Sequence, residues 1–575
     1  MTEKKIAFVI AALFFFLLLR LLQLQFVEGR ELRELSERNR LRVVKLPAPR
    51  GIIHDRNGMP LVENMPYFSV LLAPEAAEKA DTPAIADFLG VPEEDIKSKI
   101  ARKKPFEPIR LKEGLSFEEV AYISARLSDY PALDMDVDII RHYIYGESGA
   151  HVIGYLGRLN EAQAKTPGMK EVPPQAFIGQ WGVERLFDGT LRGQPGERVI
   201  EVDALGRELR VVGEVQPEKG NDITLSIDLG LQAEAERAFG AQTGALVAIG
   251  TETGEILALV SRPSFDPNLF ARGVGYDYWV SLHEDERHPM LNRALQSQYP
   301  PGSVFKVVTA IAALESKALT PQTRVSCSGG LPIGNWTFRC WEKGGHGSLD
   351  LHGAIVGSCD VYFYTAGKRA GVNDIARYAR ELGIGQASGL GLVDEKKGFM
   401  PDEQWKMEAK GQPWYLGETY NVAIGQGYVL MTPLQVARLM AAISNGGRLY
   451  ELSLLKRDAP APVVKRADIS EETLTFIRDA LFGVVNEPGG TGGRARSLRI
   501  AIAGKTGTSQ VRSSKAGRQE SGRFKEHAWF GAYAPADKPE VAMAVFVEHG
   551  GGGGAVAAPI ARRAMESYAF GNAAE

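Results

Sequence analysis

The chain has 575 residues, of which 44% are hydrophobic, and its 67 basic and 70 acidic side chains give a formal charge of −3. This length exceeds what one hydrophobic core normally organises, so two or three domains are expected. The balanced, interspersed charge excludes the strongly basic surface that nucleic-acid-binding proteins carry.

An apolar segment opens the chain. Residues 6–27 are apolar apart from three polar side chains, and two lysines precede them. At about 1.5 Å per helical residue, this segment is long enough to cross a hydrocarbon core of about 30 Å. A cleavable signal peptide is the alternative, because only residues 6–19 are uninterrupted, but no small-x-small cleavage site follows. We therefore predict a short cytoplasmic stub and a single transmembrane anchor over residues 1–27, with the rest of the chain outside the cytoplasm.

A scaffold domain is predicted over residues 28–217. Its first part, residues 33–44, is charged and suits a helix that leaves the membrane. Short strands such as residues 67–72 and 199–202 then alternate with polar helices such as residues 116–126. No group of catalytic residues is visible in this region. The pattern predicts a non-catalytic mixed α/β domain that supports a reaction site elsewhere in the chain.

The pattern changes after this domain. Residues 223–228 alternate as in a strand, residues 229–239 suit a helix, and residues 244–249 form a strongly apolar strand. A larger α/β domain is therefore predicted over residues 218–575.

Three glycine-rich or polar segments interrupt this second domain. Residues 489–493 contain four glycines and predict a flexible connection, while residues 509–527 are polar and basic, as in a solvated loop. Five glycines lie within residues 549–554. Glycines that close a strand against a neighbouring backbone are commoner than glycines that cradle a phosphate, so we expect packing here.

Ser303 and Lys306 form the first of three short motifs. A Tyr-Pro-Pro-Gly turn precedes Ser303, and the apolar residues after Lys306 predict a helix. A spacing of three places both side chains on one helical face, within reach of each other. A serine hydroxyl becomes a good nucleophile when a base takes its proton, and a lysine beside another positive charge serves as such a base. Alone, this spacing is common and usually marks a helix cap with a solvated lysine.

Two further motifs follow in the same domain. They are Ser358-Cys359-Asp360, and Lys505-Thr506-Gly507-Thr508 in a predicted strand over residues 500–508. A glycine beside a lysine and hydroxyls lets an extended peptide approach the strand closely and add as a further strand. The three motifs in this order are the signature of penicillin-binding proteins and class A β-lactamases.

The third motif also has a misleading similarity to a nucleotide site. Gly504-Lys505-Thr506 matches the end of a phosphate-binding P-loop, but Arg499 occupies the position of the first glycine of that motif. Nucleotide binding is therefore rejected.

Through these motifs the chain resembles the class B penicillin-binding proteins over nearly its whole length, and among them the elongation-type penicillin-binding protein 2 group. Further matching segments are residues 50–58, 182–184, 191–193, 425–427 and 432–435. The resemblance implies a serine transpeptidase fold, in which a central antiparallel sheet is flanked by helices and joined by an all-helical subdomain. It also implies an N-terminal mixed α/β pedestal or dimerisation-type domain and one transmembrane helix.

The activity implied by the resemblance is that of a serine-type D-Ala-D-Ala carboxypeptidase or transpeptidase. Such an enzyme cross-links peptidoglycan stem peptides during cell elongation, maintains cell shape and is inhibited by β-lactams. The implied catalytic residues are Ser303 as nucleophile, Lys306 as its base, Ser358 and Lys505 as a proton relay to the leaving amine, and Asp360. The implied substrate-binding residues are Thr506, Gly507 and Thr508, with the backbone N–H groups of Ser303 and Thr508 as the oxyanion hole.

Asp360 departs from the pattern of many relatives, which carry asparagine. An ionised aspartate accepts hydrogen bonds but donates none, so Asp360 cannot make the contact that an asparagine amide donates.

The three cysteines lie within 33 residues, and a histidine lies among them. A disulfide is the simple alternative outside the cytoplasm, but it leaves one cysteine unpaired. Four nitrogen and sulfur ligands also fit a closed tetrahedral zinc site, and the spacing alone leaves both possibilities open. The resemblance implies zinc, because the ligands of the penicillin-binding protein 2 group include the residue after the second-motif serine. We expect one structural zinc ion that braces the second motif, held by Cys327, Cys340, His346 and Cys359, with His352 as an alternative ligand.

Other functions fit the sequence less well. A soluble β-lactamase would lack the anchor and scaffold domain, and a β-lactam sensor would need a cytoplasmic effector that the short N-terminal stub does not offer. A scaffold with vestigial motifs would not need all three. Within the family, a septal division-type protein is the main alternative. The cysteine and histidine cluster and the Ser-x-Asp form of the second motif favour elongation.

The resemblance also implies partners and a location. The partners are stem peptides on a lipid-linked glycan precursor, a polytopic glycan polymerase that contacts the anchor and pedestal, and a periplasmic shape-determining protein. The location is the inner (cytoplasmic) membrane, crossed once, with the catalytic domain in the periplasm.

Overall fold

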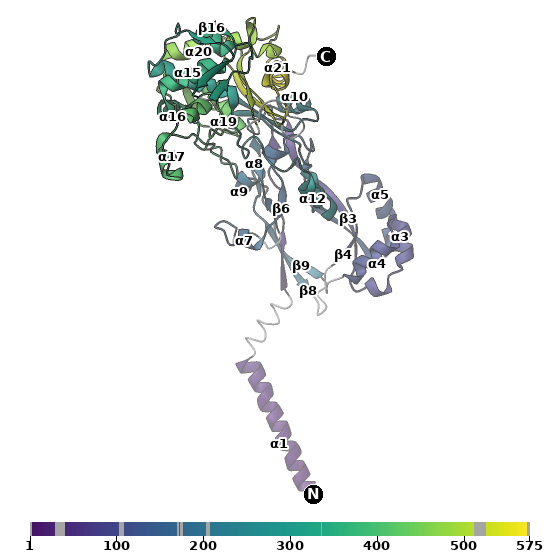
Figure 1. Ribbon diagram of the computed structural model, residues 1–575. Helices are drawn as coiled ribbons and strands as arrows, with labels where there is room; N and C mark the ends of the chain where they lie inside the picture. Colours follow the sequence, from purple (N-terminus) through teal and green to yellow (C-terminus); the bar gives the residue numbers. More distant parts are fainter. Residues whose placement is uncertain are drawn as a thin grey trace.

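A computed structural model describes residues 3–28, 41–102, 108–169, 172, 176–202, 208–334, 336–510 and 525–571. Within this part of the chain the molecule is elongated (Figure 1). The apolar helix lies at one end, the scaffold strands occupy the middle, and the larger C-terminal domain lies at the other end. The loop predicted at residues 509–527 falls mostly on residues 511–524, outside the described residues.

The N-terminal helix is α1 (Glu3–Leu22), which continues into the π-turn η1 (Gln23–Val27). Over Lys4–Val27 it is long and apolar enough to cross a membrane, and none of its apolar stretch is buried. It is the single helix of this kind among the described residues, which is consistent with the predicted single-pass anchor.

The segment after the anchor differs from the prediction. Residues 33–40 lie outside the described residues, and the rest of the helix predicted at residues 33–44 is instead part of β1 (Leu41–Leu46). This strand pairs with a later one, with Val43 opposite Val199. Two adjacent β-branched valines favour a strand once a partner strand lies beside them, and the sequence alone does not show that partner.

Three sheets build the scaffold domain. The first has the order β1-β8-β9 and the second β10-β2-β3-β4, with β5 pairing along most of β3. Their strands are β2 (Ile53–His54), β3 (Pro60–Leu72), β4 (Ile109–Glu113), β5 (Leu133–Tyr143), β8 (Gly196–Val202), β9 (Glu208–Val215) and β10 (Ile223–Thr224). The third sheet pairs β6 (Leu156–Arg158) with β7 (Phe177–Gly179). Mixed α/β character is thus confirmed, although only two residues of the strand predicted at 223–228 pair with β2, and Leu225 forms an isolated bridge with Leu455.

Short helices cover these sheets. They are η2 (Ala77–Lys79), α3 (Thr82–Leu89), α4 (Glu93–Ala101), α5 (Phe117–Arg126), η3 (Leu127–Asp129), α6 (Ala150–Ile153), α7 (Glu161–Ala164), α8 (Gly182–Leu186) and α9 (Asp188–Leu191). The helix predicted at residues 116–126 is α5, whose N-cap Ser116 and Glu119 form a capping box.

A buried ion cluster holds the scaffold domain together. Arg50 donates to Glu184 at 2.8 Å and to Asp188 at 3.0 Å, and Arg141 donates to the second oxygen of Glu184 at 2.7 Å. All four side chains are at most 8% exposed. The cluster joins the segment before β2 to strand β5 and helices α8 and α9. Because buried charges are stable only when paired, each member depends on the others.

The C-terminal domain is built on a five-stranded antiparallel sheet of order β12-β11-β21-β20-β19. Its strands are β11 (Gly244–Gly250), β12 (Ile256–Arg262), β19 (Ala503–Ser509), β20 (His527–Ala534) and β21 (Val541–Val547). Helices α10 (Leu229–Phe239) and α21 (Gly553–Phe570) pack on one face, and α19 (Pro433–Ser444) packs on the other. The predicted central antiparallel sheet with flanking helices is confirmed.

A second group of helices lies beside this sheet. It contains η4 (Gly302–Phe305), α13 (Lys306–Glu315), α14 (Leu351–Val356), α15 (Asp360–Ala370), α16 (Val372–Glu381), α17 (Glu403–Lys410), α18 (Leu416–Ala423) and α20 (Glu471–Asn486). The subdomain is not all-helical as predicted, because two small antiparallel pairs are inserted in it: β13 (Val325–Cys327) with β16 (Gly347–Leu349), and β14 (Gly330–Ile333) with β15 (Trp336–Arg339). The remaining elements are α11 (Asn268–Ala271), α12 (Tyr276–Glu284), β17 (Arg448–Tyr450), β18 (Val463–Arg466) and η5 (Gly493–Ala495).

His151 lies buried where the scaffold meets the C-terminal domain. Its Nε2 is 2.8 Å from the carbonyl oxygen of Pro289, and its ring packs edge-on against Phe265. Burial lowers the pKa of His151 to about 4. The ring is therefore neutral at neutral pH and donates its Nε2 proton across the interface.

Candidate active site

Ser303 lies on η4, directly before helix α13. Gly302 has a φ of 56°, and a Cβ atom at this position would lie 2.4 Å from the carbonyl oxygen of Thr508. Its N–H donates to the carbonyl of Gly425 at 2.9 Å. Only glycine therefore lets this turn pack against strand β19. The turn leaves Ser303 partly exposed, while its neighbours on both sides are buried.

Lys306 joins the first motif to the second. Its side chain is fully buried, and Nζ donates to the Ser358 carbonyl at 2.8 Å, the Ser358 hydroxyl at 3.2 Å and Asp360 Oδ1 at 2.6 Å. These contacts use the three protons of an ammonium group. Two motifs that are about 55 residues apart in the sequence thus meet at one nitrogen atom.

The second motif occupies the turn between α14 and α15. Ser358 has a φ of 55°, a left-handed conformation that is uncommon for residues other than glycine. Asp360, the first residue of α15, accepts a hydrogen bond from the backbone N–H of Trp341 at 2.8 Å through its second oxygen. The Asp360 carboxylate thus accepts two hydrogen bonds, one from Trp341 and one from Lys306. Neither contact requires the donor group of an asparagine.

Trp341 is a site residue that the sequence analysis did not single out. Besides its backbone contact with Asp360, its indole Nε1 donates to the carbonyl of Ser358 at 3.0 Å and to that of Gly357 at 3.2 Å. The only signal in the sequence is that Trp341 directly follows Cys340, one of the predicted metal ligands.

The third motif lies on β19, which pairs with β20 alone among the described strands and is therefore the edge strand of the sheet. Lys505 is fully buried, and Nζ donates to the carbonyl of Thr506 at 3.3 Å. Burial, together with the nearby charge of Lys306, lowers the pKa of Lys505 well below its ordinary value. A Cβ at Gly507 would lie 2.8 Å from the carbonyl oxygen of Pro301, so the glycine lets β19 pack against the turn before Ser303.

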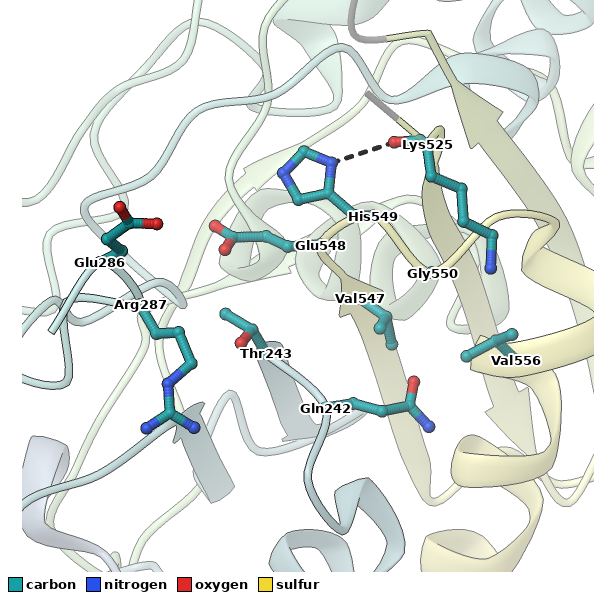
Figure 2. Close-up of a pocket in the computed structure, with 10 residues that line it drawn as sticks. All are labelled: Gln242, Thr243, Glu286, Arg287, Lys525, Val547, Glu548, His549, Gly550 and Val556. Atoms are coloured by element: carbon teal, nitrogen blue, oxygen red, sulfur yellow. Dashed lines mark hydrogen bonds between the residues drawn. The ribbon is translucent and has the colours of Figure 1, made fainter. Parts of the chain in front are cut away.

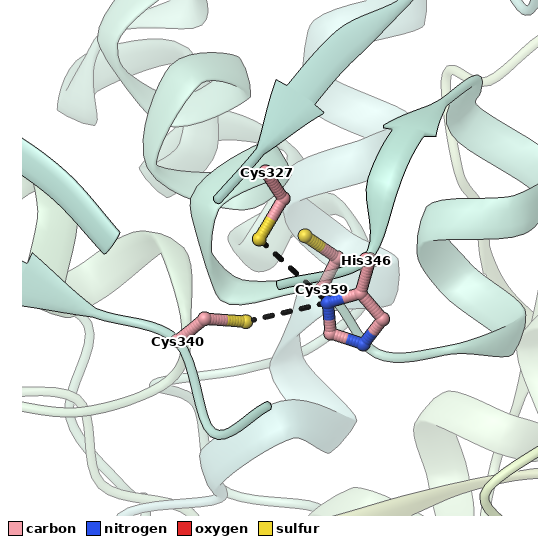
Figure 3. Close-up of side chains that lie close together, drawn as sticks. All are labelled: Cys327, Cys340, His346 and Cys359. Atoms are coloured by element: carbon pink, nitrogen blue, oxygen red, sulfur yellow. Dashed lines mark hydrogen bonds between the residues drawn. The ribbon is translucent and has the colours of Figure 1, made fainter. Parts of the chain in front are cut away.

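The four predicted metal ligands lie together (Figure 3). One ligand atom from each of Cys327, Cys340, His346 and Cys359 can be chosen such that all lie within 4.8 Å of one another. The His346 Nδ1 is 3.7 Å from the sulfur of Cys327 and 3.5 Å from that of Cys340. No disulfide links these cysteines in the described structure. His352 lies elsewhere, with its Nε2 3.0 Å from Glu487.

The protonation of this cluster suits a metal ion. His346 Nε2 lies 3.2 Å from the carbonyl of Gly357, which can only accept, so Nε2 carries a proton and Nδ1 is the nitrogen that faces the sulfurs. A hydrogen bond from the Cys359 thiol lowers the pKa of Cys340 to about 5, while the same bond raises the pKa of Cys359. A thiolate is thus available at neutral pH, and thiolate and neutral imidazole are the forms that bind zinc.

A cavity of about 610 Å³ lies away from the three motifs, at the end of β21 (Figure 2). It is lined by Gln242, Thr243, Glu286, Arg287, Lys525, Val547, Glu548, His549, Gly550 and Val556. Its charged side chains are of both signs, and none belongs to the first, second or third motif.

Comparison with known proteins gives two domain families. The penicillin binding protein transpeptidase domain matches residues 244–566, and the penicillin-binding protein dimerisation domain matches residues 45–225. The chain is 36% identical over 556 residues to the peptidoglycan D,D-transpeptidase MrdA of Acinetobacter baumannii, covering 93% of this chain and 82% of that one.

Two solved structures have the same fold. Penicillin-binding protein 2 of Helicobacter pylori, in a complex with MreC, superposes with a TM-score of 0.80 at 30% identity, covering 92% of this chain and 99% of that one. A chain of a peptidoglycan synthase complex, described for its coordination of polymerisation and crosslinking, superposes with a TM-score of 0.77 at 33% identity, covering 100% of this chain and 99% of that one.

Proposed function

The chain belongs to the class B penicillin-binding proteins, in the penicillin-binding protein 2 group, and from this premise we propose how its residues cross-link peptidoglycan as the cell elongates. The enzyme is a serine-type D,D-transpeptidase. The observation that carries the assignment of residues is the position of Lys306, which bonds to Ser358 and Asp360 of the second motif from the helix that Ser303 precedes. The third motif lies against the same turn across Gly302.

The first half-reaction forms an acyl-serine. The Ser303 hydroxyl oxygen attacks the carbonyl carbon of the penultimate D-Ala of a stem peptide, and the hydroxyl proton passes to Lys306 as Lys306 gives one of its own protons to Ser358. The 3.2 Å contact between Lys306 and Ser358 offers a route for this proton to the Ser358 hydroxyl, which protonates the departing amine. The carbon–nitrogen bond breaks and the terminal D-Ala leaves. Lys505, which is fully buried on β19, is the other member of this proton relay.

Strand β19 holds the substrate during this step. The backbone N–H groups of Ser303 and Thr508 hold the negative charge that develops on the carbonyl oxygen. The hydroxyls of Thr506 and Thr508 bind the carboxylate of the terminal D-Ala, while Gly507 leaves room for the peptide to lie along the edge strand.

The second half-reaction transfers the acyl group. The amine of a second stem peptide attacks the acyl carbon, the bond to the Ser303 oxygen breaks, and that oxygen regains a proton by the reverse route. A peptide cross-link results. A β-lactam acylates Ser303 in the same way, but its amide is cyclic, so the amine leaving group stays attached to the acyl group and the acyl-enzyme persists.

We further propose one zinc ion, held by Cys327, Cys340, His346 and Cys359. With four protein ligands the ion would be structural and would have no open position for substrate. Two ligands are the sequence neighbours of active-site residues, since Cys359 lies between Ser358 and Asp360, and Cys340 precedes Trp341. A fixed cluster would therefore hold the strained turn at Ser358 from two sides.

The location and partners are also proposals. Helix α1 would cross the inner membrane once, with Lys4 and Lys5 in the cytoplasm and the catalytic domain in the periplasm. The solved relatives in complexes with MreC and within a peptidoglycan synthase support a shape-determining partner and a glycan polymerase for this chain too. Stem peptides on the growing glycan would be the substrate.

Fluorescent penicillin labelling of the full chain in detergent tests the central assignment. We expect wild type and a control, Ser281→Ala on the exposed face of α12, to be labelled, and Ser303→Ala to lose the label while its unfolding temperature is unchanged. Release of D-Ala from a pentapeptide should follow the same pattern. Labelling of Ser303→Ala at the wild-type level would contradict the proposed mechanism.

A further inference from the structure

The glycine-rich loop at residues 489–493 is packed, in contrast to the flexible connection that its composition predicts. The N–H of Gly492 donates to the carbonyl of Val484 at 2.9 Å, and that of Gly490 to Glu487 at 3.1 Å. A Cβ at Gly490 would lie 2.4 Å from the Val484 carbonyl oxygen. These glycines let the loop fold back against the end of α20, so the residue between them is held in a defined place.

That residue, Thr491, lies between the second and third motifs. Its N–H donates to the carbonyl of Val356, two residues before Ser358, at 3.4 Å. A Cβ at Gly554, in the first turn of α21, would lie 2.2 Å from its carbonyl oxygen. Its side-chain hydroxyl lies 2.7 Å from the hydroxyl of Thr506, on β19.

The direction of this hydroxyl pair follows from proton counting. A hydroxyl donates one hydrogen bond and accepts up to two, whereas a carboxylate only accepts. If Thr506 donates its single proton to a substrate carboxylate, it must accept from Thr491. Thr508 shows the same arrangement, because its hydroxyl accepts from the N–H of Gly553 at 3.4 Å and keeps its own proton free. With Thr491 as the donor, the hydroxyls of Thr506 and Thr508 each accept one hydrogen bond from within the protein and can donate to the substrate.

We propose that Thr491 is a positioning residue, whose hydroxyl donates to Thr506 and so turns the Thr506 proton toward the carboxylate of the substrate. This inference rests on the proposed function, in which Thr506 binds that carboxylate. The chain of two donors also strengthens the outer hydrogen bond, because each bond polarises the next.

The test compares a carboxylate ligand with the same ligand lacking the charge. The second-order rate constant of acylation is measured with benzylpenicillin and with its methyl ester, for wild type, Thr491→Val, Thr491→Ser, Thr506→Val and the double variant. Valine keeps the shape of threonine without a donor, and serine keeps the donor. Thr491→Val removes one hydrogen bond between two hydroxyls, so it should slow acylation by penicillin about five- to tenfold.

Three further results are expected. Thr491→Val should change acylation by the ester less than about twofold, Thr491→Ser should stay within about twofold of wild type for both ligands, and the double variant should be no slower than Thr506→Val alone. The ratio of acid to ester is independent of the fraction of folded enzyme.

The role of Thr491 would be overturned if Thr491→Val lowered the acylation rate constant equally for the acid and the ester. It would also be overturned if the two substitutions lowered that rate constant additively in the double variant. An unchanged rate for Thr491→Val in an enzyme that is acylated at Ser303 would overturn it as well and leave the proposed function intact. A wild type that is not acylated at Ser303 would overturn both.

Discussion

Lys306 and Asp360 form a buried ion pair in which Nζ lies 2.6 Å from Oδ1, although the two residues come from different helices. The second oxygen of the same carboxylate accepts the backbone N–H of Trp341. One side chain therefore connects the helix that follows the nucleophile, the second motif and the loop that carries Cys340.

Replacing Asp360 tests this connection. In Asp360→Asn the amide oxygen can still accept from Lys306, but the amide nitrogen cannot accept from Trp341, and one orphaned donor costs about 1 to 3 kcal/mol. We expect acylation by benzylpenicillin to slow about tenfold. Asp360→Leu leaves a buried lysine without its partner, at a cost of about 3 to 5 kcal/mol, and should slow acylation at least a hundredfold. Equal rates for the two variants would contradict the ion-pair role.

Trp341→Phe should hold the turn at Ser358 less firmly and so slow acylation moderately. The change removes the indole donor to the carbonyls of Ser358 and Gly357 but keeps the backbone contact with Asp360. We expect acylation to slow about fivefold, the effect of about 1 kcal/mol. Trp336→Phe is the matched control, since Trp336 is 70% exposed on the neighbouring hairpin and should leave the rate unchanged. A similar loss in both variants would point to a general effect of the hairpin region.

Metal removal tests the zinc proposal. We expect elemental analysis to find one zinc per chain in wild type and in Ser303→Ala, and none in Cys327→Ser, which changes a ligand on β13 rather than one inside the second motif. Zinc loss should lower both the unfolding temperature and the acylation rate, because the turn at Ser358 loses its brace. Wild type that labels normally and contains no zinc would contradict the proposal.

His151 should make the protein sensitive to acid. Its pKa is about 4 in the folded chain and about 6.5 in the unfolded chain. Between these values the unfolded chain binds a proton that the folded chain does not, so stability falls as the pH decreases through this range. The loss amounts to about 3 kcal/mol by pH 4. Unfolding followed by tryptophan fluorescence from pH 7 to 4 should show a smaller decrease for His151→Gln than for wild type; parallel curves would contradict this account.

Glu184→Gln should destabilise the scaffold domain. It removes the charge that two buried arginines share, and breaking a buried ion cluster costs about 3 kcal/mol. We expect faster proteolysis of the scaffold domain, with penicillin labelling retained at low temperature. Glu214→Gln, which changes an exposed ion pair with Arg198, is the control and should behave like wild type. Equal proteolysis of the two variants would show that burial does not matter here.

Sequence and structure agree best where the signal is local. Ser303 with Lys306, Ser358, and Lys505 each belong to a motif of a few residues, so pattern and resemblance were enough to nominate them, and the structure brings the motifs together. Trp341 and Thr491 were missed because their contacts are with residues far along the chain. The hydrogen-bond partners of Asp360 could not be predicted for the same reason, because Lys306 and Trp341 are distant from it in the sequence.

Elements were predicted wrongly where a neighbour decides the conformation. Residues 41–44 were predicted as the end of a helix over residues 33–44, but strand β8 pairs with them. Residues 489–493 read as flexible because glycine restricts the chain least, yet the same lack of a side chain permits the closest packing. Composition does not distinguish these two uses of glycine; the surrounding backbone does.

The close packing at Gly302 and Gly507 has a consequence for how this enzyme can evolve. Any side chain at either position would clash with the backbone of the facing segment. Neither glycine can therefore be replaced where the turn before Ser303 packs against strand β19. Variants that escape β-lactams yet still cross-link peptide are therefore expected to keep glycine at both positions. Surveys of resistant isolates should find both glycines unchanged.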